Sequence, residues 1–188
     1  MLLASETPYR FTVEDYEKLG AAGIFDEDDR VELLDGEIII MAPIGIRHVQ
    51  AVRRLNKQMN RAFGAHCLVD CQNPFILDGL SEPQPDILLL HPRTEESDVL
   101  PGPADIFLVV EVAESSLGYD RGRKLQRYAT AGIREVWVVD LVHRLIEIFR
   151  EPSAEGYRVR LEARPGETLA PAAFAERTIA VNDILPKA

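Results

Sequence analysis

Two long apolar runs constrain the fold of this chain more than any other feature of its sequence. They occupy residues 85–90 (Pro-Asp-Ile-Leu-Leu-Leu) and 105–113 (Asp-Ile-Phe-Leu-Val-Val-Glu-Val-Ala). Neither run alternates between apolar and polar positions, as a strand does when only one of its faces is buried. Continuous runs are typical of strands that are covered on both faces. We therefore expect two inner strands of a sheet that has helices packed on both sides.

Shorter patterns predict the elements around these two strands. The pair Asp35-Gly36 lies between two apolar segments and predicts a β-hairpin, because a type I′ turn needs positive φ at both central positions. Apolar spacing and helix-end signals predict helices over residues 13–21, 46–63 and 120–131. Further strands are expected over residues 66–71, 74–77, 135–141, 145–150 and 157–161. The order predicts a mixed α/β (α+β) fold, with a central mixed sheet flanked by helices and an N-terminal hairpin.

The length and composition favour one globular domain over residues 1–188. The net charge of -10 argues against a protein that coats DNA broadly, since such domains are usually basic. We find no signal peptide and no apolar segment long enough to span a membrane. We expect no disulfide framework, because the chain has only two cysteines. These features favour the cytoplasm and no membrane partner.

Each apolar run carries one carboxylate, Asp86 in the first and Glu111 in the second. A buried carboxylate is costly unless it is paired, hydrogen-bonded or bound to a cation. If the runs form an antiparallel pair with Leu90 opposite Phe107, Asp86 lies opposite Glu111 on the same face. Two carboxylates this close repel unless a proton or a cation lies between them, and oxygen ligands suit Mg²⁺ or Mn²⁺. A register slip of one residue would place the acids on opposite faces and remove this predicted site.

A basic segment follows the second run. It contains Arg121, Arg123, Lys124 and Arg127, with no acid among them. In the predicted helix, Lys124 lies beside the apolar face and is the member best placed to point inward. Near two metal-bound carboxylates it would hold a phosphate or orient an attacking water, although an ordinary solvated lysine is the alternative. The three arginines would bind the phosphates of a substrate.

The pair Pro85-Asp86, followed in the next strand by Glu111-Val112-Ala113, resembles the PD-(D/E)XK motif of the restriction-endonuclease-like superfamily. Ala113 occupies the usual lysine position of the motif, and Lys124 is similar to the migrated lysine of some branches. The chain more closely resembles the Uma-two family of proposed endonucleases. The matching residues run along most of the chain: 32–37, 41–43, His48, 85–86, 111–112, 115–116, Asp120, Lys124, Tyr128, 132–133, 135–137 and 139–140.

The resemblance implies a restriction-endonuclease-like core and metal-dependent hydrolysis of phosphodiester bonds, with DNA as the expected substrate and Mg²⁺ or Mn²⁺ as the cofactor. Asp86, Glu111 and Lys124 would be catalytic. The metal ligands would be Asp86, Glu111, the carbonyl of Val112 and, by resemblance to an early acid of the family, Glu32. His48 is a weaker candidate for the site.

Other interpretations remain open. Asp86 could cap backbone groups at the start of its strand, Glu111 could pair with an arginine of the basic segment, and Glu32 could form a salt bridge with Arg30 or another arginine. With these roles the chain would be a non-catalytic, nuclease-like binding or assembly module. A phosphoesterase acting on RNA or on a small nucleotide is a third interpretation. The sequence does not fix the assembly, and a homodimer is possible.

Overall fold

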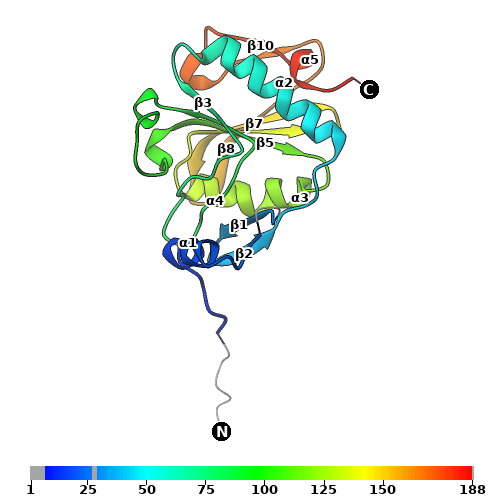
Figure 1. Ribbon diagram of the computed structural model, residues 1–188. Helices are drawn as coiled ribbons and strands as arrows, with labels where there is room; N and C mark the ends of the chain where they lie inside the picture. Colours follow the sequence, from blue (N-terminus) through cyan, green and yellow to red (C-terminus); the bar gives the residue numbers. More distant parts are fainter. Residues whose placement is uncertain (1–6, 27–28, 188) are drawn as a thin grey trace.

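A six-stranded mixed sheet forms the centre of the computed structural model, which describes residues 7–26 and 29–187 (Figure 1). The strands follow one another across the sheet in chain order, and only β5 and β6 are parallel neighbours. The two apolar runs form β4 and β5, which are adjacent inner strands as predicted. The strands are β3 (Leu68–Cys71), β4 (Ile87–Leu90), β5 (Ile106–Ala113), β6 (Glu135–Asp140), β7 (Leu145–Ser153) and β8 (Gly156–Ala163).

Helices cover both faces of this sheet, which explains why β4 and β5 are apolar throughout. Helices α2 (Ile46–Phe63) and α5 (Val181–Ile184) pack on one face in a buried cluster that includes Val110 and Trp137. The connection from β5 to β6 crosses the other face, where Tyr128 packs in a second cluster with Val109. Figure 1 shows α2 and α4 (Leu125–Thr130) on opposite sides of the sheet.

The predicted hairpin is formed by β1 (Val31–Leu34) and β2 (Glu37–Ile40), which pair antiparallel. Its turn residues Asp35 and Gly36 have φ of 54° and 71°, the two positive values that a type I′ turn needs. Helix α1 (Val13–Ala21) precedes the hairpin and begins at a capping box, as its sequence predicted. In Figure 1 the hairpin lies beyond α4 from the sheet, so it closes that side of the molecule.

The helix predicted over residues 120–131 is less regular than its sequence indicated. It starts as a short turn, α3 (Leu117–Tyr119), and widens into a π-helical turn over Asp120–Lys124. Regular α-helix is confined to α4, which Gly132 ends with a φ of +79°. π-Helical turns are rare and are frequently found at functional sites.

The strand predicted over residues 74–77 was wrong. Phe75 and Leu77 are buried, as an inner strand would be, but the backbone N–H groups here bond to surrounding loops. Phe75 donates to the carbonyl of Pro83, and Leu77 to that of Ser81, so the segment joins no ladder of the sheet.

The C-terminal part covers the edge of the α2 face. Two short strands, β9 (Thr168–Leu169) and β10 (Ile179–Ala180), pair antiparallel, and Phe174 stacks on Phe63 of α2 with ring centroids 5.4 Å apart. None of the helices within residues 7–26 and 29–187 combines the length and apolar character that a membrane span requires.

Candidate active site

Strands β4 and β5 bring Asp86 and Glu111 to one end of the strand pair. Ile87 pairs with Val110 in the register predicted for this end, and one further step sets Asp86 across from Glu111. Both acids therefore project toward the face that α4 covers.

At the opposite end of the same ladder, the predicted register was wrong. A β-bulge between Leu89 and Leu90 shifts the pairing, so that Leu90 lies opposite Ile106 instead of Phe107. A bulge adds one unpaired residue on one strand and changes only the pairing beyond it. The register at the acids is therefore unaffected.

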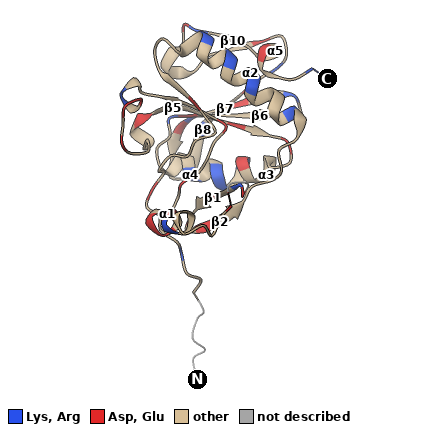
Figure 2. Cartoon of the chain, viewed as in Figure 1, with Lys and Arg blue, Asp and Glu red and all other residues tan. Residues whose placement is uncertain are grey.

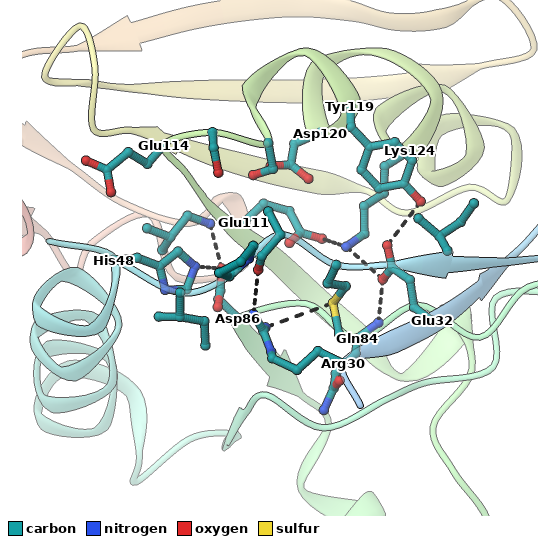
Figure 3. A pocket seen from close by; sticks show the side chains of 18 of the residues that line it. Arg30, Glu32, His48, Gln84, Asp86, Glu111, Glu114, Tyr119, Asp120 and Lys124 are labelled. Atoms are coloured by element: carbon teal, nitrogen blue, oxygen red, sulfur yellow. Dashed lines mark hydrogen bonds and ion pairs between the residues drawn. The ribbon is translucent and has the colours of Figure 1, made fainter. Parts of the chain in front are cut away.

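The two acids open into one pocket between the hairpin, the start of α2 and the α3 turn (Figure 3). Its lining holds four carboxylates and one lysine that are all nearly inaccessible to solvent, with exposed fractions of 1% to 7%. These five residues are Glu32, Asp86, Glu111, Asp120 and Lys124. The pocket therefore collects more buried acids than its one lysine can pair with.

Lys124 points inward, as the sequence predicted. Its Nζ lies 3.0 Å from Oε1 of Glu111 and 3.0 Å from Oε2 of Glu32. Burial alone would lower the pKa of Lys124, but the charges of Glu111, Glu32 and Asp120 outweigh it and raise that pKa well above its ordinary value. Lys124 is therefore a cation held between two acids.

Glu111 is partnered by a lysine and a tyrosine, and not by an arginine of the basic segment. The hydroxyl of Tyr128 donates to Oε1 of Glu111 over 2.7 Å. Burial raises the pKa of Glu111 to about 8; Lys124 acts against this shift, while Asp120 and Asp86 add to it. Facing acids alone would predict a raised pKa, but here burial is its main cause.

Asp86 is held by donors on three sides. Its Oδ2 accepts the backbone N–H of Val112 over 2.8 Å and lies 3.1 Å from Nε2 of His48, while Oδ1 accepts from Gln72 over 3.2 Å. Asp86 therefore binds a backbone group of the facing strand β5, and not one at the start of its own strand β4. His48, the weaker candidate, thus touches a predicted catalytic acid, and its Nδ1 is buried with no hydrogen-bond partner among the described residues.

Glu32 joins the hairpin to the pocket. It accepts hydrogen bonds from the hydroxyl of Tyr119 and from the backbone of Gln84, each over 3.1 Å, in addition to its contact with Lys124. The suggested salt bridge to Arg30 is not formed, since that guanidinium donates to the carbonyl of Ala42. Glu32 therefore has three donors from the chain itself.

The sequence prediction missed Asp120 as a member of the site. Ser116 donates to its carboxylate over 2.6 Å, and burial raises the pKa of Asp120. Asp120 precedes Lys124 by four residues, a spacing that places both on one side of a helical turn. That spacing, together with its place in the family pattern, was the signal available in the sequence.

The three predicted substrate-binding arginines do not line the pocket. Arg121 pairs with buried acids of β6 and β7, while Arg123 and Arg127 both bind Asp35 in the hairpin turn, over 3.0 Å and 2.7 Å. These pairs neutralise the basic segment within the chain, and those of Arg123 and Arg127 fasten the hairpin to the β5–β6 connection. We therefore do not include these arginines in the proposed site.

The carboxylates of the pocket offer oxygen atoms of the type that a divalent cation takes, but not a complete set of side-chain ligands among the described residues. Four buried carboxylates and one lysine line the pocket, and carboxylate oxygens are the ligands that Mg²⁺ and Mn²⁺ prefer. In the described part of the chain, no three His, Cys, Asp or Glu side chains are arranged to hold a metal by themselves. Asp86 and Glu111 would therefore need backbone or water oxygens as additional ligands, and Val112, whose carbonyl was predicted for this role, lines the pocket.

Comparison with known proteins identifies a family and several similar solved structures. A family model described as "Uma2: Putative restriction endonuclease" matches residues 13–182. One of these structures is that of a putative nuclease belonging to DUF820 from Anabaena variabilis ATCC 29413. It matches with a TM-score of 0.73 over 93% of this chain and 97% of its own, at 14% sequence identity, which shows a shared fold. No curated protein matches.

Proposed function

Because the chain belongs to the Uma2 family of putative restriction endonucleases, as its sequence predicted, we propose that it is a metal-dependent endonuclease that hydrolyses phosphodiester bonds in DNA. One observation supports this most: Asp86 and Glu111 meet across adjacent strands in a pocket that also holds a buried lysine. The fold shared with a putative nuclease supports the class of protein.

Asp86, Glu111 and the carbonyl of Val112 would hold one Mg²⁺ or Mn²⁺ ion. The excess of buried acids is the physical reason, since burial and neighbouring acids raise the pKa of Glu111, and a divalent cation would favour its charged form in place of a proton. When bound, such an ion polarises a phosphate oxygen and lowers the pKa of a coordinated water.

The residues of the chain would orient these groups. The backbone N–H of Val112 and the ring of His48 fix the carboxylate of Asp86, and the hydroxyl of Tyr128 fixes that of Glu111. Lys124 would neutralise charge that develops on the phosphate, once a phosphate oxygen replaces one of its two carboxylate partners.

The direct test is incubation of the purified protein with duplex DNA, single-stranded DNA, RNA and nucleoside phosphates, with Mg²⁺, Mn²⁺ or EDTA. The proposal predicts cleavage of DNA that requires the metal. Cleavage of RNA or nucleotides alone would favour the phosphoesterase interpretation. Cleavage that persists in EDTA would contradict the metal-dependent reaction.

A non-catalytic binding module is the second candidate, and one observation favours it. Lys124 already pairs with Glu32 and Glu111, so the acids have a cation from the chain itself. In that case neither metal should change the melting temperature, and no substrate should be cut.

A further inference from the structure

Helix α2 differs in charge from the rest of the chain. It contains five basic residues and no acid, within a chain of net charge -10. Figure 2 shows these basic residues along α2, on the side of the sheet opposite α4. The helix therefore presents a local positive field on an acidic protein.

Three of the five cations form a stripe on the outer face of the helix. Arg53, Lys57 and Arg61 follow one another at intervals of four residues, which places them on one side of a helix. All three are exposed, and none forms an ion pair with a described residue. Like charges at this spacing repel and destabilise a helix. A bound polyanion would remove that repulsion.

The other two arginines of α2 are engaged with the chain. Arg47 pairs with Glu114 over 3.2 Å, and Arg54 donates to the carbonyl of Leu185 over 2.7 Å. The stripe is therefore the part of the helix whose charges are available to a partner.

The stripe lies between the candidate active site and a second arginine. His48, in the first turn of the same helix, lines the pocket. Arg53 follows it by about 7.5 Å along the helix axis and about 140° around it, so the stripe faces outward from the helix. At the other end, Arg61 and Arg177 line a shallow hollow, which Asp183 also borders. Phosphates bound by the stripe would therefore lie outside the pocket, on the outer side of the helix whose first turn borders it.

We propose that the exposed face of α2, formed by Arg53, Lys57 and Arg61, binds the phosphate backbone of the nucleic acid that is cut in the pocket. The identity of the partner rests on the proposed function. This surface would supply the positive charge that the paired arginines of the β5–β6 connection cannot. Phosphate contacts of this kind position a nucleic acid without reading its sequence.

An anionic membrane fits this surface less well. A helix that lies on a membrane buries an apolar face among the lipids, next to its basic residues. The apolar face of α2, which includes Leu55 and Met59, is instead buried against the sheet. The outward face carries polar residues beside the cations, such as Gln50 and Asn60.

The test compares two triple variants with the same change of net charge. One carries Arg53→Gln, Lys57→Gln and Arg61→Gln. The control carries Arg134→Gln, Arg158→Gln and Lys187→Gln, which are also exposed and form no ion pair with the described residues. Binding to labelled DNA duplexes of two unrelated sequences is measured with Mg²⁺ over a range of salt concentrations. Asp86→Asn is present in every protein to prevent cleavage.

The α2 variant should bind both duplexes at least about tenfold more weakly at low salt. The magnitude of the slope of the logarithm of its binding constant against the logarithm of the salt concentration should fall by about 2.7, since each of the three phosphate contacts contributes about 0.9. The control variant should keep most of the salt dependence of the Asp86→Asn protein. Equal effects of the two triple variants, or binding to phosphatidylserine vesicles without binding to DNA, would overturn the inference.

The proposed function can fail separately. If the protein with Asp86 intact does not cut DNA but its binding depends on the α2 stripe, the catalytic proposal falls and the surface stands. If DNA is cut and the α2 variant binds as the control does, the surface falls and the catalytic proposal stands.

Discussion

Lys124 and Glu111 form a buried ion pair in which Nζ lies 3.0 Å from Oε1, and neither residue is more than 5% exposed. The pair joins the β5–β6 connection to the sheet beneath it. Removing one partner of a buried pair leaves an uncompensated charge, whereas removing both is far less costly. Lys124 therefore has a structural role that any test of its catalytic role must separate.

Lys124→Met should lower the free energy of unfolding by about 3–5 kcal/mol, because it leaves Glu111 and Glu32 without their cation. Adding Glu111→Gln to this variant should recover part of the loss. A double-mutant cycle that also includes Glu111→Gln alone, measured by urea unfolding, gives the interaction free energy between Lys124 and Glu111. Additive losses would show that the pair does not contribute to stability.

At temperatures where the variant is folded, Lys124→Met should reduce the single-turnover cleavage rate more than it reduces the affinity for DNA. The reason is that a charge acting on the transition state changes turnover rather than ground-state binding. Cleavage rate and binding are measured on the same duplex. A variant that cuts as fast as the wild type would make Lys124 a purely structural residue.

Millimolar Mg²⁺ or Mn²⁺ should raise the melting temperature of the wild-type protein, because a ligand bound only by the folded state stabilises it. At a hundredfold excess over its Kd, one ion would add about 2.7 kcal/mol. Asp86→Asn should weaken the effect, while Glu162→Gln, a change at an exposed acid of β8, should not. An equal shift in all three proteins would indicate metal binding elsewhere.

Stability should also depend on pH through Glu82, a buried acid whose Oε2 has no hydrogen-bond partner among the described residues. Burial, aided by Glu17, raises the pKa of Glu82 from 4.5 to about 7. Between these values the folded state retains a proton that the unfolded state has lost. The contribution of Glu82 is therefore complete below pH 4.5 and decreases as the pH rises to about 7.

The loss corresponds to roughly 3–4 kcal/mol, since the two pKa values differ by about 2.5 and one pKa unit corresponds to about 1.36 kcal/mol. Glu82→Gln should remove this part of the pH dependence. Urea unfolding of both proteins across the interval is the measurement. Parallel curves for wild type and variant would show that Glu82 keeps an ordinary pKa.

The sequence predicted the centre of the fold well, because the responsible signals are local. The apolar runs located β4 and β5, Asp35-Gly36 located the hairpin turn, and the bounds of α2 were exact. Counting along two neighbouring strands was enough to place Asp86 across from Glu111.

Features that depend on distant contacts were not predictable in this way. The arginines beside Lys124 looked like a free basic surface, and only the packed hairpin shows that Arg123 and Arg127 bind Asp35. The π-helical turn and the β-bulge are set by packing, for which the sequence carries no simple pattern. The stripe on α2 lay within a correctly predicted helix, but its importance appeared only when the other arginines proved to be paired.

The most direct test of the catalytic role of Asp86 and Glu111 is the rate of DNA cleavage by three isosteric variants over a titration of Mn²⁺. Asp86→Asn and Glu111→Gln should each cut at least about a hundredfold more slowly than the wild type at every concentration, as expected when a group essential to the transition state is removed. Glu162→Gln, the exposed control, should cut at the wild-type rate. Cleavage by Asp86→Asn and Glu111→Gln as fast as by this control would contradict the proposed active site.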